Sequence, residues 1–180
     1  MPSTLKFGLF VPAALVATLG LPSAASSQYR LPTITASVVA QADSLHDSAI
    51  LQAEKTRWRD AARLHRESAA LRAPEDSLGF RCLRAAANLS YVGNDLLSAQ
   101  SDIVAAAEQA RARGDVEEAA LAYADAAWVA NERKRPAEMW TLGRQAEVLA
   151  SSPLLSTAQR NNILRRFVHA DAEVAVQDTR

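Results

Sequence analysis

Three histidines and one cysteine are the residues of this chain that could ligate a transition metal, act as a general base or serve as a nucleophile. His46 stands close to Asp43 and Asp47, and imidazole and carboxylate are both metal donors. All three residues fall on one predicted helix, where such groups more often form a solvated face. We therefore expect no metal site, no cofactor and no catalytic residue there.

The other candidates for chemistry fit structural roles better. His65 falls where two helices are expected to pack, and His169 lies near the end of the last helix, where an imidazole suits the helix dipole. Cys82 is the one cysteine, so no intramolecular disulfide is possible, and its position predicts a small packed hydrophobe. The chain has no His-Glu-x-x-His, no nucleophile elbow and no glycine-rich phosphate loop. We predict that the protein is not an enzyme.

Charge argues against one class of partner. The 180 residues carry 20 basic and 20 acidic side chains, whereas a nucleic-acid-binding protein normally has a clear positive excess. We therefore expect no nucleic-acid partner. Arg59, Arg63 and Arg66 form a stripe on one predicted helix, with Glu67 following, and this pattern predicts a salt-bridged exterior rather than an anion site.

The N-terminal segment has the composition of a secretory signal peptide. Lys6 precedes an apolar run from Phe7 to Leu21, and small residues follow it. The run is shorter than the about 20 apolar residues of a membrane span. We expect residues 1–26 to be removed, with cleavage after Ala25, and the protein to be secreted or periplasmic. The alternative is an uncleaved anchor, which would be the chain's only contact with a membrane.

Any site must be positioned by helices, and the clearest of these follows Gly114. Asp115 stands where an N-cap should stand, and Gly114 suits the end of the preceding helix. The following residues are mostly alanine, which has the highest helix propensity. One face of this helix carries small residues and a single aromatic, as expected for helices that approach closely: Ala119, Tyr123, Ala126, Ala127 and Ala130.

The rest of the chain shows the same kind of helix and turn signals. Residues 27–36 predict an extended leader, and helices are predicted over about 37–55, 58–72, 75–92, 95–113, 115–133 and 136–150. Ser37 or a neighbour is predicted to cap the first, Gly93 to end the third, and a seventh helix opens at Ser156, which has capping-box spacing to Gln159. Breaks at Thr56, Asn94 and Arg135 recur roughly every 38 to 41 residues, and repeated helix pairs stack into solenoids. We predict an all-α fold over residues 37–176, a right-handed α-solenoid of about three helix hairpins plus a C-terminal capping helix, with a frayed tail at 177–180.

The helix pairs resemble those of the tetratricopeptide-repeat (TPR) family over about residues 42–151. In each pair the first helix carries mostly small residues at the family's helix A positions: Leu45, Ser48, Ala49 and Gln52; Cys82, Ala85, Ala86 and Leu89; Tyr123, Ala126, Ala127 and Ala130. The helix B positions are Ala61, His65 and Ser68; Ala99, Ile103 and Ala106; Met139, Gly143 and Ala146. The fourth and fifth helices can be paired instead, which leaves the core unchanged but changes the concave face.

In the first pairing, three aromatics and three polar side chains fall toward the inner face of the solenoid: Phe80, Tyr91, Trp128, His46, Glu54 and Glu132. Aromatic anchors with polar neighbours suit a groove for a peptide or a partner helix. The alternative is that these aromatics pack between repeats or beneath the last helix.

These observations predict an exported, TPR-like scaffold or adaptor of a bacterial cell envelope that binds a protein or peptide. One alternative is an accessory subunit of a membrane-associated complex, anchored by an uncleaved N-terminal helix. Another is a small-molecule-binding or enzymatic site in the concave surface, near His46 or Glu54.

Overall fold

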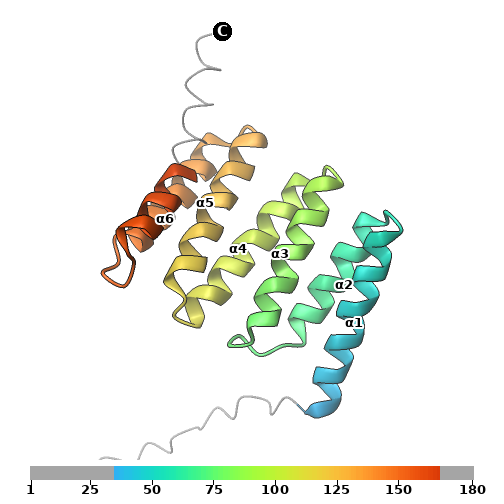
Figure 1. The fold of residues 1–180 in the computed structure, drawn as a ribbon. Helices are drawn as coiled ribbons and strands as arrows, with labels where there is room; N and C mark the ends of the chain where they lie inside the picture. Colours follow the sequence, from blue (N-terminus) through green and yellow to red (C-terminus); the bar gives the residue numbers. More distant parts are fainter. Residues whose placement is uncertain (1–34, 167–180) are drawn as a thin grey trace, which may run out of the picture. The chain divides into compact units, whose positions relative to one another are not determined.

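The computed structural model describes residues 35–166, and every regular element in that range is a helix (Figure 1). The six long helices are α1 (Ala36–Glu54), α2 (Trp58–Ala70), α3 (Ser77–Val92), α4 (Leu96–Ala112), α5 (Val116–Glu132) and α6 (Pro136–Ala150). A shorter helical segment, residues 157–166, follows them. The predicted signal peptide, most of the predicted leader, the last part of the predicted capping helix and the predicted tail lie outside the described residues.

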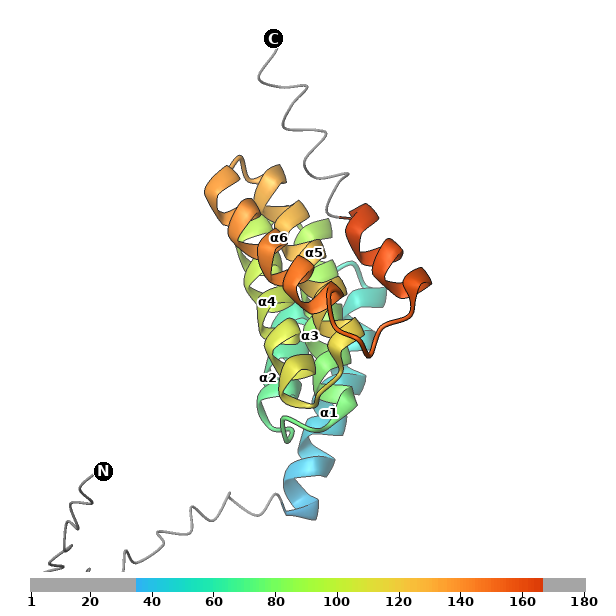
Figure 2. The same cartoon turned by 90° about the vertical axis from the view of Figure 1, so that its left-hand side faces the viewer.

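The six helices form two layers. Each helix packs against its neighbours in the sequence, from α1 against α2 to α5 against α6. Figure 2 shows α1, α3 and α5 in one layer and α2, α4 and α6 in the other, with residues 157–166 beside α5 on the outer side of the first layer. The predicted all-α solenoid with a capping helix is therefore confirmed. Within residues 35–166, no helix combines the length and the apolar character needed to cross a membrane.

Aspartates begin three of the helices. Asp76, Asp95 and Asp115 are the N-caps of α3, α4 and α5, and their carboxylates accept hydrogen bonds from backbone amides of the first turn at 2.8, 3.1 and 3.2 Å. Each carboxylate satisfies an amide that lacks a partner within the helix, and its charge suits the positive end of the helix dipole. The predicted caps at Asp95 and Asp115 are confirmed.

One type of turn recurs at four helix junctions. A residue in the left-handed region follows each helix: Thr56 (φ 58°), Asn94 (φ 60°), Gly114 (φ 78°) and Lys134 (φ 57°). At each junction the next amide bonds back to a carbonyl in the last helical turn, as in the 2.8 Å bond from Asp95 to Ser90. This is the Schellman arrangement. The left-handed residue after α3 is Asn94, whereas Gly93, predicted for that role, has φ −75°.

Helix α5 is buried on most of its surface. The sequence predicted one packed face, and those five residues are all at most 1% exposed. Because α5 lies between α4 and α6 and is also flanked by residues 157–166, further residues are buried as well: Ala120, Ala122, Ala124, Val129 and Asn131. A helix that is apolar around most of its circumference is expected in such a position.

The two ends of the described chain differ in how closely they follow the predictions. The capping box is confirmed, since the Ser156 amide donates to Gln159 Oε1 at 2.8 Å and the Gln159 amide donates to Ser156 Oγ at 3.3 Å. Ile163 anchors this segment and is fully buried. At the other end the cap was predicted at Ser37 or a neighbour. The N-cap is Thr35, whose side chain makes no capping hydrogen bond, and Ser37 lies inside the first turn of α1.

The arginine stripe on α2 is only partly an exterior. Arg63 pairs with Glu67 at 2.7 Å on the surface, as predicted. Arg66 instead reaches Asp102 on α4, whose side chain is only 8% exposed. Arg72, after α2, is likewise buried and pairs with Asp43 at 2.5 Å. Arginines therefore join helices of the solenoid as well as covering it.

Candidate binding groove between α3 and α5

The candidate functional site is a cavity of about 210 Å³ between α3 and α5, which we call the α3–α5 groove. Helix α4 contributes Ile103 to it. The side chains that give it its character come from the two flanking helices: Arg84, Asn88 and Tyr91 from α3, and Asp125 and Trp128 from α5. Since α3 and α5 belong to the same layer, the groove lies on the face formed by the first helices of the predicted pairs.

Two aromatic side chains meet across the groove. The ring centroids of Tyr91 and Trp128 are 5.2 Å apart, and the ring planes are tilted by 39°. That separation is within the range of favourable aromatic pairs, about 4.5–7 Å. Tyr91 remains 37% exposed and Trp128 is half-buried, so the pair is held in place while part of its apolar surface remains accessible.

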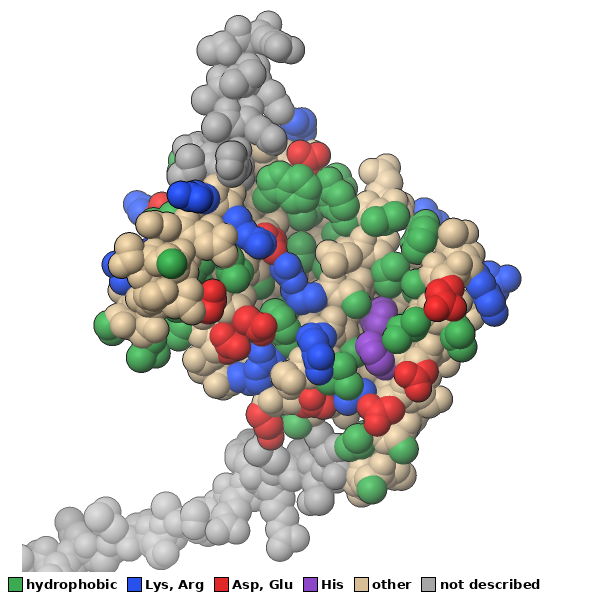
Figure 3. Space-filling model, viewed as in Figure 1, with side chains coloured by type: hydrophobic (Ala, Val, Ile, Leu, Met, Phe, Trp, Pro, Cys, Tyr) green, Lys and Arg blue, Asp and Glu red, His purple; other side chains and the backbone are tan. Residues whose placement is uncertain are grey.

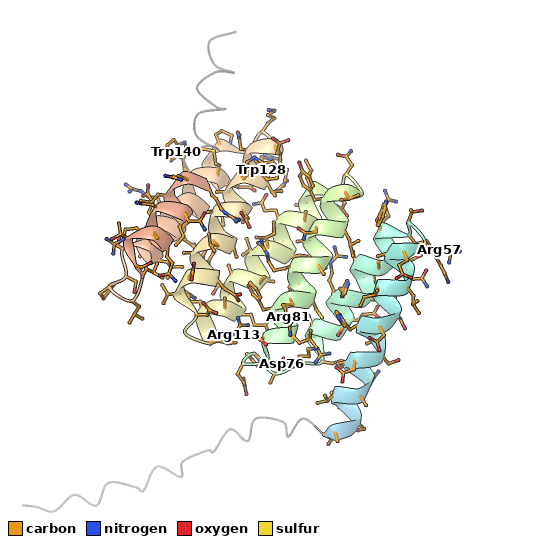
Figure 4. The ribbon with its side chains drawn as sticks, viewed as in Figure 1. Arg57, Asp76, Arg81, Arg113, Trp128 and Trp140 are labelled. Atoms are coloured by element: carbon orange, nitrogen blue, oxygen red, sulfur yellow. The ribbon has the colours of Figure 1, made fainter. Side chains whose placement is uncertain are left out.

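The groove is lined by one positive and one negative side chain, Arg84 and Asp125, and further arginines lie outside its lining. Arg84 pairs with Asp125 Oδ2 at 2.6 Å, and Arg166 of the last segment pairs with Asp125 Oδ1 at 2.7 Å. Arg84 Nη1 has no hydrogen-bond partner among the described residues. Arg81, one turn earlier on α3, is exposed (Figure 4). Figure 3 shows basic side chains in a line across this face, below a group of hydrophobic ones.

Of the residues predicted for the inner face, the structure brings two of the aromatics together and separates the third. Phe80 does not join Tyr91 and Trp128: it is 8% exposed and packs against alanines of α4 and α5. The guanidinium carbon of Arg113 lies 5.1 Å from its ring centroid. Phe80 therefore packs between repeats, which was the alternative to a place on the inner face. It lies near the start of α3, where residues of α4 and α5 cover it.

The three predicted polar residues do not line the groove. Glu54 and Glu132 are the last residues of α1 and α5, beside the turns at Thr56 and Lys134. His46 lies in the middle of α1, and its ring contacts His65 on α2 rather than the aspartates beside it in the sequence. Only some of the residues predicted for the inner face line the groove. Helical periodicity predicts which side of a helix a residue occupies, but it does not predict which residues of neighbouring helices lie at the same height.

Sequence reasoning did not single out Arg84 and Asp125. They are 41 residues apart, close to one repeat length, and they occupy the first helices of neighbouring pairs. Opposite charges at a separation of one repeat were therefore a signal that could have located the groove. Asp125 is a single carboxylate that belongs to no recognised sequence motif, so nothing else in the sequence distinguished it.

The fold and the groove define an α-solenoid with one candidate binding surface. The other cavities described within residues 35–166 include an open one of about 620 Å³ beside Arg113 and Leu154, and neither His46 nor Glu54 lines any of those cavities. Comparison of the chain with protein-family models, with curated proteins and with solved structures finds no match.

Proposed function

We propose that this protein is an exported, TPR-like scaffold that binds a segment of another protein in the α3–α5 groove. The observation that carries the proposal is that the Tyr91–Trp128 pair and the Arg84–Asp125 ion pair line the same cavity. Tyrosine, tryptophan and arginine are the residue types that most often dominate binding energy at protein interfaces. In stacked helical repeats, partners also commonly bind the surface formed along the stack.

The groove indicates the chemistry of the segment that it would bind. Partly exposed rings of Tyr91 and Trp128 favour an apolar or aromatic side chain of the partner. Arg84 and Arg166 share one carboxylate, and Arg81 adds a further positive charge nearby. We therefore expect a partner segment in which an apolar side chain lies close to a carboxylate. A carboxylate could accept two hydrogen bonds from a single guanidinium group.

Export is the second part of the proposal and is supported by residues 1–26. Their basic residue, apolar run and small residues are the pattern of a secretory signal peptide. Mass spectrometry of protein from the envelope fraction tests cleavage: a new N-terminus at Ser26 supports a removed signal peptide, whereas a retained Met1 supports the uncleaved anchor. Absence of the protein from the envelope and secreted fractions contradicts export.

The groove is tested by selecting peptides from a displayed random library on the full mature chain and measuring their affinities by calorimetry. Trp128→Ala should weaken the selected peptides by at least about tenfold, as expected for a central aromatic anchor. The matched control is Trp140→Ala, which changes a 46% exposed tryptophan on α6, outside the groove (Figure 4).

The outcome is decided by the comparison of the two tryptophan variants. Selected peptides should carry an apolar residue near an acidic one, and Trp140→Ala should leave their affinity unchanged. If Trp128→Ala binds as tightly as the wild type, or if both variants lose affinity equally, the groove is not the binding surface.

A further inference from the structure

A second cluster of side chains lies where α1, α2 and α3 meet, outside the α3–α5 groove. His46 Nδ1 is 3.4 Å from His65 Nδ1 and 3.5 Å from Cys82 Sγ. The donor atoms of the three residues all lie within 4.8 Å of one another. Each residue comes from a different helix, so the cluster is held by three packed elements and not by a loop.

The separations of these atoms match a metal coordination sphere. In a tetrahedral centre with metal–nitrogen bonds of about 2.05 Å and metal–sulfur bonds of about 2.3 Å, two nitrogens are about 3.4 Å apart and a nitrogen is about 3.6 Å from the sulfur. The distances at His46 agree with both values. Hydrogen bonds from N–H donors are normally shorter, about 2.7–3.2 Å, so the imidazole separation fits coordination better than a direct bond. The donor atoms of His65 and Cys82 need to approach each other by about 1.2 Å at most.

The surroundings of the cluster hold its donor atoms in place. Cys82 is fully buried and has no disulfide partner. The Cys82 thiol donates to Ser68 Oγ at 3.6 Å, and the Ser68 hydroxyl donates to the Ala42 carbonyl at 2.7 Å. These two bonds fix the position of the sulfur before an ion binds.

The donor set determines the class of ion. Two imidazoles and a thiolate suit borderline and soft ions such as Zn²⁺, Co²⁺ and copper, whereas Mg²⁺ and Ca²⁺ need oxygen ligands. Asp43, considered from the sequence as a ligand beside His46, pairs instead with Arg72 at 2.5 Å. Entry is possible from the side of His46, which is only half-buried, and Figure 3 shows histidine side chains reaching the surface of this face.

We propose that His46, His65 and Cys82 bind one Zn²⁺-class transition-metal ion, with the fourth position open to water or a partner's ligand on the side of His46. The ion would join α1 and α2 to α3, and so the first helix pair to the second. Binding releases the thiol proton of Cys82 and leaves the sulfur as a thiolate ligand, because a coordinated thiol is deprotonated. The buried sulfur has no room to attack a larger substrate, which favours an ion over nucleophilic chemistry.

The test is a titration of the full mature chain with Co²⁺ after treatment with a chelator. Co²⁺ occupies zinc sites and gives a near-ultraviolet band only when a thiolate is bound. We expect one Co²⁺ per chain with this band, its displacement by Zn²⁺, and a Zn²⁺-dependent rise in the melting temperature. Cys82→Ala and His46→Gln should each weaken binding by at least about tenfold, because each removes one of three ligands.

Asp47→Asn is the matched control, since it changes an exposed residue beside His46 without removing a cluster ligand. It should bind Co²⁺ as the wild type does. Circular dichroism should show that Cys82→Ala keeps its helical fold, because alanine is smaller than the buried cysteine that it replaces. Absence of binding to the wild type, a bound ion without the thiolate band, or unchanged affinity in Cys82→Ala overturns the proposal.

Discussion

The Nε atom of Arg66 lies 2.8 Å from Oδ1 and 3.0 Å from Oδ2 of Asp102, which joins α2 to α4. The same guanidinium donates through Nη2 to Ser90 Oγ on α3 at 2.7 Å, so one side chain bonds to both of the next two helices. The Asp102 side chain is 8% exposed. Burial raises the pKa of Asp102 against the opposing effect of Arg66, because the carboxylate has lost most of its water.

Asp102→Ala should lower the free energy of unfolding by about 3 kcal/mol, because it leaves the Arg66 guanidinium partly buried without its counter-ion. The double variant Arg66→Met, Asp102→Leu should regain most of that loss, since an apolar pair of similar volume can replace a buried ion pair. Urea unfolding measures both. Arg63→Ala is the control and should change stability by less than about 1 kcal/mol, because the Arg63–Glu67 pair is exposed. If Asp102→Ala lowers the free energy of unfolding by no more than Arg63→Ala does, the Arg66–Asp102 pair does not stabilise the contact between repeats.

The left-handed turn residues give a second prediction. Thr56 has φ 58°, which is strained for a β-branched side chain, whereas Gly114 has φ 78° without strain. Thr56→Gly should raise the free energy of unfolding by about 1 kcal/mol, and Gly114→Ala should lower it by a similar amount. Asn94→Gly is the reference with a small effect, because asparagine tolerates this region. Thermal unfolding measures all three, and stabilisation by Gly114→Ala would contradict the turn assignment.

The helices were predictable because each carries several agreeing local signals. Asp115 caps α5, Gly114 turns the chain before it, and alanines fill the helix. Where the local signal was weak, the prediction was less exact: Ser37 or a neighbour was expected to cap α1, and the N-cap is Thr35, two residues before Ser37. The choice between Gly93 and Asn94 failed because both residues tolerate a left-handed turn, and the position of the last helical hydrogen bonds decides between them.

The sites were less predictable because they are formed between helices. Trp128 and Tyr91 could be assigned to one face, but nothing local places them at the same height along the stack. His46 was compared with carboxylates on its own helix, while its contacts are His65 and Cys82 on the next two. Such contacts depend on how the helices pack, and in a single sequence the repeat length is the only indication of that packing.

Tyr123 gives a prediction about alkaline pH. Its side chain is 1% exposed, and its hydroxyl donates to Glu108. Burial, and then the hydrogen bond and charge of Glu108, raise the pKa of Tyr123 from 10.0 to about 12. Between these two values the unfolded chain loses this proton and the folded chain keeps it, so stability should fall as pH rises from about 10 towards 12.

The titration is measured by tyrosinate absorbance of the folded protein, with Tyr123→Phe as the control. The difference between the two curves should be a transition with its midpoint near pH 12. Tyr123→Phe should also lose the part of the alkaline destabilisation that this residue causes. A difference curve centred near pH 10 would show that the phenol is neither buried nor bonded to a carboxylate.

Asp125→Asn tests the electrostatics of the α3–α5 groove. Asp125 balances Arg84 at 2.6 Å and Arg166 at 2.7 Å, and the substitution removes that negative charge while keeping the shape of the side chain. Peptides selected for an apolar residue beside a carboxylate should then bind up to about tenfold more tightly, because a ligand carboxylate no longer competes with Asp125 for the arginines. The gain should shrink as salt is raised, since the groove is partly open to solvent.

Calorimetry with each peptide and its amide analogue separates the effect of charge from an effect on the fold. The analogue, which has no carboxylate, should bind the variant and the wild type equally. If Asp125→Asn instead binds the peptide and its amide analogue with equally reduced affinity, Asp125 holds α3 and α5 in place and the arginines do not recognise the partner's carboxylate.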